Sequence, residues 1–281
     1  MPGFAYPPQY ADTGGVRLAW VEAGPPDGEP VLLLHGEPSW SFLYRTVMAV
    51  LAEAGLHAIA VDLAGFGRSD KPADIGDHSY ARHVEWIRGL AFDRLDLRGL
   101  TLVGQDWGGL IGLRLVAEHP DRFARVVVAN GFLPAGQTQA ALAFRVWRAF
   151  ARYSPVFPIG RIVAQGCVSK LTPAERAAYD APFPSAEFKV GARVFPELVP
   201  TEADDPAMPA NRAAWEALGK WQKPFLALFG KDDPILGKAD GRLIRHVPGA
   251  AGQPHERIWG GHFVQEDRGD YLAEAVVRWK A

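Results

Sequence analysis

Short apolar runs alternate with helical spacing in the first half of the chain. Val16–Glu22 alternates apolar and polar residues, as a half-buried strand does. Further runs that read as buried strands lie at 31–34, 57–61, 100–103 and 126–129. Helical spacing lies between them, at 42–54 (with Ser41 as a candidate cap), 80–95 and 110–118. This alternation predicts a mostly parallel sheet with helices on both faces.

The pattern changes after Asn130. From Gly131 to about Trp215 the chain shows helices and many prolines but no strand pattern. Strand signals return at Pro224–Phe229 and Glu256–Trp259, and a helix over 271–279 follows. We therefore expect an α/β core of residues 1–130 and 216–281, interrupted by a helical cap of residues 131–215. Such an insertion would cover the carboxyl ends of the strands, where ligands bind in this architecture.

Composition narrows the class of protein. The 281 residues carry a formal net charge of -2 without blocks of like charge, so neither nucleic acid nor an anionic membrane is an expected partner. No apolar run approaches the roughly 18 residues that span a bilayer, and the first ten residues do not resemble a signal peptide. Cys167 is the only cysteine, which favours a reducing compartment. We expect a cytoplasmic, monomeric enzyme.

A glycine-flanked aspartate follows the strand at 100–103. The segment Gly104-Gln105-Asp106-Trp107-Gly108-Gly109 has the form of a nucleophile elbow, a sharp strand-to-helix turn that needs small flanking residues. The turn points one side chain out of the sheet at a helix N-terminus, where N–H groups favour negative charge. Asp106 alone is also consistent with an ordinary helix N-cap.

Two later loops supply partners in the order that an α/β-hydrolase requires, namely nucleophile, acid and histidine. Asp232 and Asp233 follow the strand at 224–229, and spacing from Gly230 favours Asp233 as the acid. His262 follows the last strand, in Gly260-Gly261-His262-Phe263. Of the other histidines, His35 belongs to a loop motif, and the rest are expected at the surface: His57, His78, His83, His119, His246 and His255.

These motifs resemble those of haloalkane dehalogenases, which have the α/β-hydrolase fold. The resemblance covers nearly the whole chain. The matching segments are His35-Gly36-Glu37-Pro38-Ser39-Trp40, Asp62-Leu63-Ala64-Gly65-Phe66-Gly67-Arg68-Ser69-Asp70, the elbow, Gly261-His262-Phe263-Val264-Gln265-Glu266 and, in the cap, Ala181-Pro182-Phe183-Pro184 and Phe195-Pro196. Soluble epoxide hydrolases share the Asp-Trp elbow, while Glu37 and Trp147 favour the dehalogenases.

Within that family the chain resembles one of two groups. That group has a glutamate in the loop after the strand at 31–34, here Glu37, and its acid after the strand that follows the cap, here Asp233. The alternative acid position holds Asn130, which cannot act as a carboxylate. The resemblance implies a halide site between Trp107 and Trp147, whose indole N–H groups are donors on apolar rings. Trp147 is also consistent with packing in the cap.

The resemblance also implies a mechanism. Asp106, ionised at neutral pH, would displace halide from an alkyl carbon, and His262, oriented by Asp233, would activate water to hydrolyse the ester. Backbone N–H groups of Glu37 and Trp107 would form the oxyanion hole. No metal or organic cofactor is implied. The expected substrate is a short haloalkane in a small apolar pocket, formed by Leu110, Phe144, Phe195, Pro196, Val199, Ile235 and Leu236.

Two alternatives remain at this point. An epoxide hydrolase would use the same aspartate but needs acids that protonate the opening ring, usually two cap tyrosines, and the cap contains Tyr153 and Tyr179. A non-catalytic small-molecule receptor on the same fold would tolerate loss of the triad, whereas every triad position here is filled.

Overall fold

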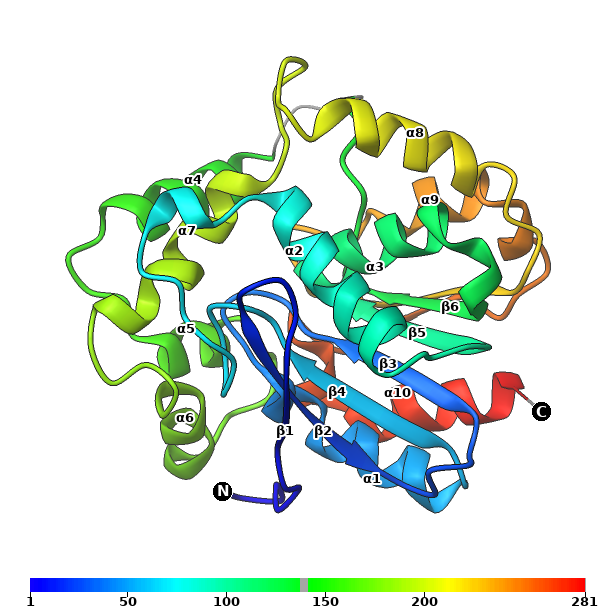
Figure 1. Cartoon of the computed structure of the whole chain (residues 1–281), viewed down its shortest axis with the longest axis horizontal. Coiled ribbons are helices and arrows are strands. Elements are labelled where there is room, and N and C mark those ends of the chain that lie inside the picture. The colour runs from blue at the N-terminus through cyan, green and yellow to red at the C-terminus, as the bar shows by residue number, and fades with distance from the viewer. Residues whose placement is uncertain (137–140, 281) are drawn as a thin grey trace.

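The computed structural model describes residues 1–136 and 141–280, and an eight-stranded sheet forms its centre (Figure 1). The strand order is β1-β2-β4-β3-β5-β6-β7-β8. β1 and β2 pair antiparallel, as do β2 and β4, and every other pair is parallel. The strands are β1 (Gln9–Asp12), β2 (Arg17–Ala23), β3 (Pro30–Leu34), β4 (His57–Asp62), β5 (Leu100–Gln105), β6 (Phe123–Ala129), β7 (Phe225–Gly230) and β8 (Glu256–Ile258).

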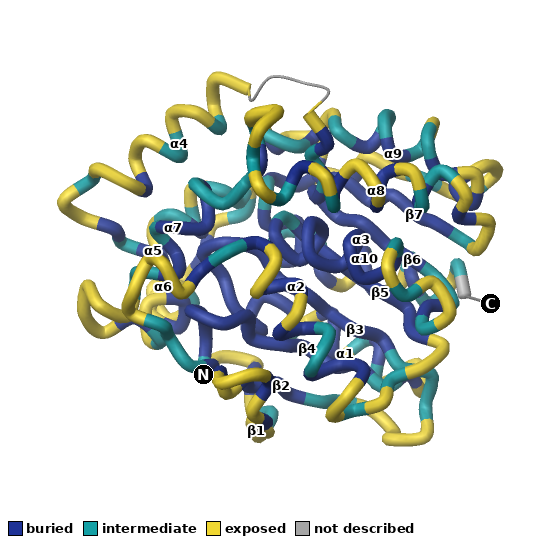
Figure 2. Tube along the Cα trace, turned by 45° about the horizontal axis from the view of Figure 1, so that its top comes forward, coloured by how far each residue is buried: buried dark blue, intermediate teal, exposed yellow. Residues whose placement is uncertain are grey.

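Helices cover both faces of the sheet, and the central strands between them are buried (Figures 1 and 2). On one face α1 (Arg45–Glu53) packs against α10 (Val264–Lys280). On the other, α3 (Trp107–Glu118) packs against α2 (Tyr80–Arg88) and α8 (Met208–Leu218), while α9 (Asp240–His246) packs on β7. Within the described residues, no helix has both the length and the apolar character required to cross a membrane.

The inserted cap contains α4 (Leu142–Tyr153), α5 (Ile159–Gln165), α6 (Pro173–Asp180) and α7 (Val190–Leu198). The expected end of the cap at residue 215 falls inside α8, which lies on the core helix α3. Asn211 of α8 accepts a 3.0 Å hydrogen bond from Arg114 of α3. We therefore propose that the cap comprises α4 to α7 and that α8 belongs to the core layer.

The structure differs locally from several of the predicted elements. Ser41 does not cap a long helix: it starts a 3-10 turn over Ser41–Tyr44, and its N–H donates to Asp62 Oδ1 at 2.8 Å. The helix expected over 80–95 changes after Arg88 into a π-helical segment, Gly89–Arg94. β1 was not predicted, because only Ala11 of this short edge strand is buried.

Candidate active site

Asp106 lies at the turn from β5 into α3. Its backbone has φ 49° and ψ -119°, a strained conformation for a residue with a side chain. The neighbouring glycines allow close approach of the chain: a Cβ on Gly108 would lie 1.9 Å from Leu34 O, and one on Gly36 would lie 2.3 Å from Asp106 Cβ. The glycines that flank Asp106 in sequence and space are therefore required by packing.

The two carboxylate oxygens of Asp106 have different surroundings. Oδ1 accepts a 2.9 Å hydrogen bond from the Glu37 N–H, and the Trp107 N–H also donates to this carboxylate. Oδ2 faces Nε2 of His262 at 3.7 Å. Burial raises the pKa of Asp106, while His262 and the two N–H donors act in the opposite direction. Oδ1 is thus held by the Glu37 N–H, and Oδ2 is directed toward the imidazole.

His262 and Asp233 form a buried pair. His262 Nδ1 lies 2.9 Å from Asp233 Oδ2. Although burial opposes ionisation of Asp233, contacts with His262, Asn130 and the Ile235 N–H lower its pKa to about 2. Burial likewise opposes the charged ring of His262, but Asp233 and Asp106 outweigh it and raise its pKa to about 9. The neighbouring Asp232 is exposed at the surface.

The sequence interpretation missed two polar residues at strand ends. Asn130 was considered only as an alternative acid, yet its side chain donates to Asp233 Oδ2 at 2.7 Å and accepts from the Gly230 N–H at 2.6 Å. Gln105, the last residue of β5, is fully buried and bonds to the His262 loop. A buried polar residue at the carboxyl end of a strand is the signal that could have identified both.

Glu37 and Trp147 interact at the junction of core and cap. Glu37 is 5% exposed, and its Oε1 has no hydrogen-bond partner among the described residues. Burial and the charge of Asp106 raise the pKa of Glu37 well above its usual range, and a hydrogen-bonding contact from the Trp147 side chain opposes this rise. Trp147 also stacks on Phe150, at 5.7 Å between ring centroids. Burial and the charge of Asp106 therefore both favour the neutral form of the Glu37 carboxyl.

A cleft of about 430 Å³ opens beside this group, between the cap and the core loops. From the core, Glu37, Asp233 and His262 line it, together with Ile235. Its apolar wall comes from the cap helices α4 and α5 and the residues just after them. The cap residues at the cleft are Ala143, Val146, Trp147, Phe150, Ile162, Gln165, Gly166, Cys167 and Val168.

The expected pocket residues are distributed over several places. Phe144 lies outside the described lining of the cleft, because α4 presents Ala143, Trp147 and Phe150 there and about 100° per residue turns Phe144 to the other side of Trp147. Phe195 packs on the buried Trp107, at 4.5 Å between ring centroids. The remaining expected residues outside this lining are Leu110 and Pro196, which are buried, and Val199 and Leu236, which are half-buried.

Comparisons with known proteins identify the family of this chain. The family model for the alpha/beta hydrolase fold matches residues 29–269. A haloalkane dehalogenase of Mycobacterium marinum is 59% identical over 269 residues, which cover 96% of this chain and 90% of that protein. The chain belongs to the haloalkane dehalogenase family.

Other haloalkane dehalogenases are similar over the same extent. One from Psychrobacter cryohalolentis is 48% identical, covering 99% of this chain and 94% of that protein. The tetrameric structure of haloalkane dehalogenase DpaA from Paraglaciecola agarilytica has a TM-score of 0.90 and 37% identity, covering 98% of this chain and 93% of that one. The predicted α/β-hydrolase fold and the predicted family are thus confirmed.

The cap tyrosines distinguish this haloalkane dehalogenase family member from the epoxide hydrolase alternative. Tyr153 is 73% exposed on α4. Tyr179 is fully buried, and its hydroxyl donates to Glu266, which also pairs with Arg45 of α1. Neither hydroxyl is directed at Asp106, so the acid pair that epoxide opening needs is absent from the described cap residues.

Two histidines that were expected at the surface are instead buried. His78 and His83 are 4% and 1% exposed, and their rings stack. His83 also contacts Phe195 of the cap, at 4.5 Å between ring centroids. The prediction was wrong because the helix that carries His83 is covered by the cap, which the local sequence does not indicate.

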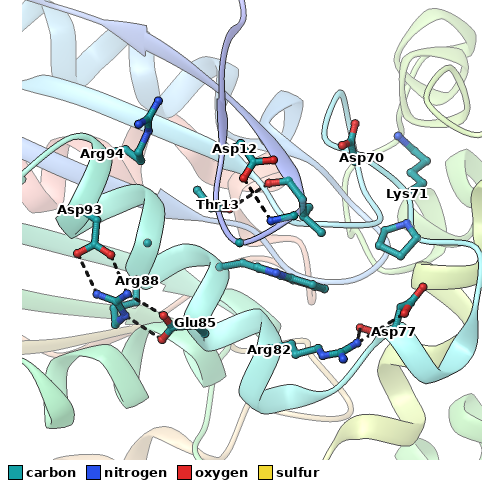
Figure 3. Close-up of a pocket in the computed structure, with 16 residues that line it drawn as sticks. Asp12, Thr13, Asp70, Lys71, Asp77, Arg82, Glu85, Arg88, Asp93 and Arg94 are labelled. Atoms are coloured by element: carbon teal, nitrogen blue, oxygen red, sulfur yellow. Dashed lines mark hydrogen bonds and ion pairs between the residues drawn. The ribbon is translucent and has the colours of Figure 1, made fainter.

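A larger hollow, of about 1050 Å³, shares no lining residue with the cleft beside Asp233 and His262 (Figure 3). It runs along the β1–β2 turn, the loop after β4, and α2. Its wall is charged, and its side chains neutralise one another: Arg88 pairs with Glu85 and Asp93, and Arg82 pairs with Asp77 (Figure 3). These exposed pairs give the hollow a solvated surface.

Proposed function

We propose that this protein hydrolyses haloalkanes to an alcohol, a halide ion and a proton, through an ester on Asp106. The observation that carries the proposal is that the two oxygens of that carboxylate have different neighbours. Oδ1 is held by the Glu37 N–H, and Oδ2 is left facing His262. A serine hydrolase would have a hydroxyl here and would need its histidine for the first attack, whereas a carboxylate attacks an alkyl carbon without a base.

In the first step, Oδ2 of Asp106 forms a bond to the carbon that bears the halogen. The carbon–halogen bond breaks, and the halide leaves with the electron pair. Because the pKa of His262 is raised to about 9, its ring is protonated at neutral pH and pairs with the ionised nucleophile. Indole N–H groups of Trp107 and Trp147 would stabilise the leaving halide, as donors that carry no charge.

Ester formation changes the charge beside His262. The carboxylate of Asp106 raises the pKa of this ring, and the ester carries no such charge. The pKa of His262 therefore falls after alkylation, which favours release of the ring proton to solvent and the neutral form that acts as a general base. Formation of the ester in the first step thus favours the form of His262 that acts as the base in the second step.

In the second step, water attacks the Asp106 carboxyl carbon while His262 Nε2 accepts a proton. The negative charge develops on Oδ1, which already has the Glu37 N–H at 2.9 Å. Collapse of the intermediate expels the alkoxide, which takes a proton from His262, and the proton left on Asp106 then passes to His262 and restores the starting pair. The net proton of the reaction is the one that the ring released after alkylation. The buried Glu37 carboxyl can position the water because its Oε1 has no hydrogen-bond partner among the described residues.

Halide release from brominated alkanes tests the proposal. Purified protein with 1-bromobutane should release bromide and butanol in equal amounts, and Asp106→Ala should release neither. Turnover of a styrene-type epoxide without bromide release would favour the epoxide hydrolase alternative. Binding of either compound without turnover would favour a receptor.

The oligomeric state is a separate proposal. The expected monomer stays a prediction, and one similar solved structure is described as tetrameric. Sedimentation equilibrium at micromolar concentration should give a mass near 30.6 kDa for a monomer. A mass about four times larger would indicate a tetramer and contradict the monomer proposal.

A further inference from the structure

Gln105 connects three groups of the candidate site. Its Oε1 accepts a 3.1 Å hydrogen bond from the Gly36 N–H, in the loop that carries Glu37. Its Nε2 donates to the His262 carbonyl at 3.1 Å and lies 3.2 Å from His262 Nε2. The side chain is fully buried, so these contacts replace hydration.

The two backbone contacts fix the orientation of the amide. A backbone N–H needs an acceptor and a backbone carbonyl needs a donor. The Gly36 N–H therefore requires Oε1 of Gln105, and the His262 carbonyl requires the NH₂ group. Rotating the amide by 180° would break both bonds at once. The NH₂ group must consequently be the one that faces the imidazole.

This orientation matters for the tautomer of His262. Asp233 binds at Nδ1, so the proton of the neutral ring lies on Nδ1 and the lone pair on Nε2. An NH₂ donor opposite Nε2 can hydrogen-bond to that lone pair. In the doubly protonated ring the same NH₂ group would face an N–H, which disfavours that form. We infer that Gln105 is a positioning residue for ester hydrolysis, which holds the His262 ring at the oxyanion loop and favours its neutral form.

The charged groups around His262 act in the opposite direction. Asp233 on the loop after β7 and Asp106 at the elbow both favour the protonated ring. Glu37, on the oxyanion loop, lines the same cleft, and burial and the charge of Asp106 raise the pKa of its carboxyl. Once Asp106 is esterified, Gln105 and Asp233 are the polar side chains hydrogen-bonded to the ring. Gln105 is the one that favours the free base.

The inference rests on the proposed function, and rapid-mixing kinetics with 1-bromobutane can separate the two. The bromide burst reports alkylation, and loss of the alkyl-enzyme in mass spectra reports hydrolysis, each measured from pH 5 to 10. For Gln105→Leu we expect a burst within about threefold of wild type and hydrolysis slowed about tenfold or more, as loss of base alignment implies. The midpoint of the hydrolysis profile should move to higher pH.

Gln105→Glu provides a second variant of nearly the same shape. It keeps an acceptor for Gly36 but places a carboxylate against His262, so the midpoint should move upward by about one unit or more. Gln265→Leu is the matched control, because this buried glutamine lies three residues after His262 and contacts Tyr44 instead. It should keep the wild-type midpoint.

The results distinguish failure of the inference from failure of the proposed function. If both Gln105 variants slow the two steps by the same factor and keep the wild-type midpoint, Gln105 is only structural and the inference is wrong. If wild type shows a burst followed by hydrolysis, that result leaves the proposed function intact. No burst and no alkyl-enzyme from wild type would instead overturn the proposed function, and the inference with it.

Discussion

The Glu37 N–H donates a 2.9 Å hydrogen bond to Oδ1 of Asp106, so the donor proposed for the oxyanion hole is already occupied by the nucleophile's own oxygen. The same oxygen would carry the negative charge when water attacks the ester. The donor therefore needs no rearrangement between alkylation and hydrolysis, which is the condition under which such groups stabilise a transition state well.

The acid of the triad can be tested with adjacent residues. Asp233→Asn should reduce turnover by about two to four orders of magnitude, because the fully buried side chain orients His262. Asp232→Asn is the matched control, since this side chain is exposed, and it should retain turnover within about twofold. Steady-state bromide release measures both. Greater damage from Asp232→Asn would remove Asp233 from this role.

The proposed halide donors can be tested by fluorescence. Trp107→Phe and Trp147→Phe should each weaken bromide binding by about tenfold to a hundredfold, because a hydrogen bond to an ion contributes about 1.5–3 kcal/mol. Quenching of tryptophan fluorescence by added bromide or iodide measures the affinity. Trp215→Phe is the control, because Trp215 stacks on His246, away from the cleft lining. Unchanged halide affinity in Trp147→Phe would assign Trp147 to cap packing.

Much of the core was predictable because its signals are local. Apolar runs define the buried strands β3, β5 and β7, and the glycines around Asp106 follow from close contacts that only glycine allows. The order of Asp106, Asp233 and His262 along the chain then indicates which loops meet at the carboxyl edge of the sheet. The structure brings these three side chains together.

The features that the sequence did not predict depend on contacts between segments that are distant in sequence. Asn130 and Gln105 became informative only when their bonds to Asp233 and His262 were visible, 103 and 157 residues away along the chain. Phe144 was assigned from its spacing to Trp147, but helical spacing alone leaves open which side of Trp147 faces the cleft. The burial of His83 likewise depends on how the cap lies over α2.

Substrate length is expected to reflect the crowded surroundings of Trp107. Phe195 packs against this buried ring, so we predict that specificity constants are highest for 1-bromoalkanes of about two to four carbons. Each added methylene contributes about 0.8 kcal/mol until the chain forces aromatic rings from their rotamers. Bromide should exceed chloride, with no fluoride release. A maximum at six or more carbons would show that the α4–α5 cleft accommodates the chain.

The raised pKa of His262 predicts a specific dependence of stability on pH. The folded value is about 9 and the ordinary value 6.5, so the stabilisation is complete below pH 6.5 and is lost as the pH rises through 9. At about 1.4 kcal/mol per unit, the loss should be at most on the order of 3 kcal/mol. Urea unfolding at pH 6 and pH 10 should show this loss in wild type relative to His262→Phe. A constant difference between the two proteins would contradict the assignment.

The covalent intermediate is the central claim, and mass spectrometry of His262→Phe tests it most directly. Without the base, alkylation should proceed and ester hydrolysis should stop. After exposure to 1-bromobutane, the intact protein should gain one butyl group, and the peptide that contains Asp106 should carry it. His246→Phe, which changes a histidine on α9, should show no accumulation. A butyl group on another residue, or continued bromide release without any adduct, would contradict the account.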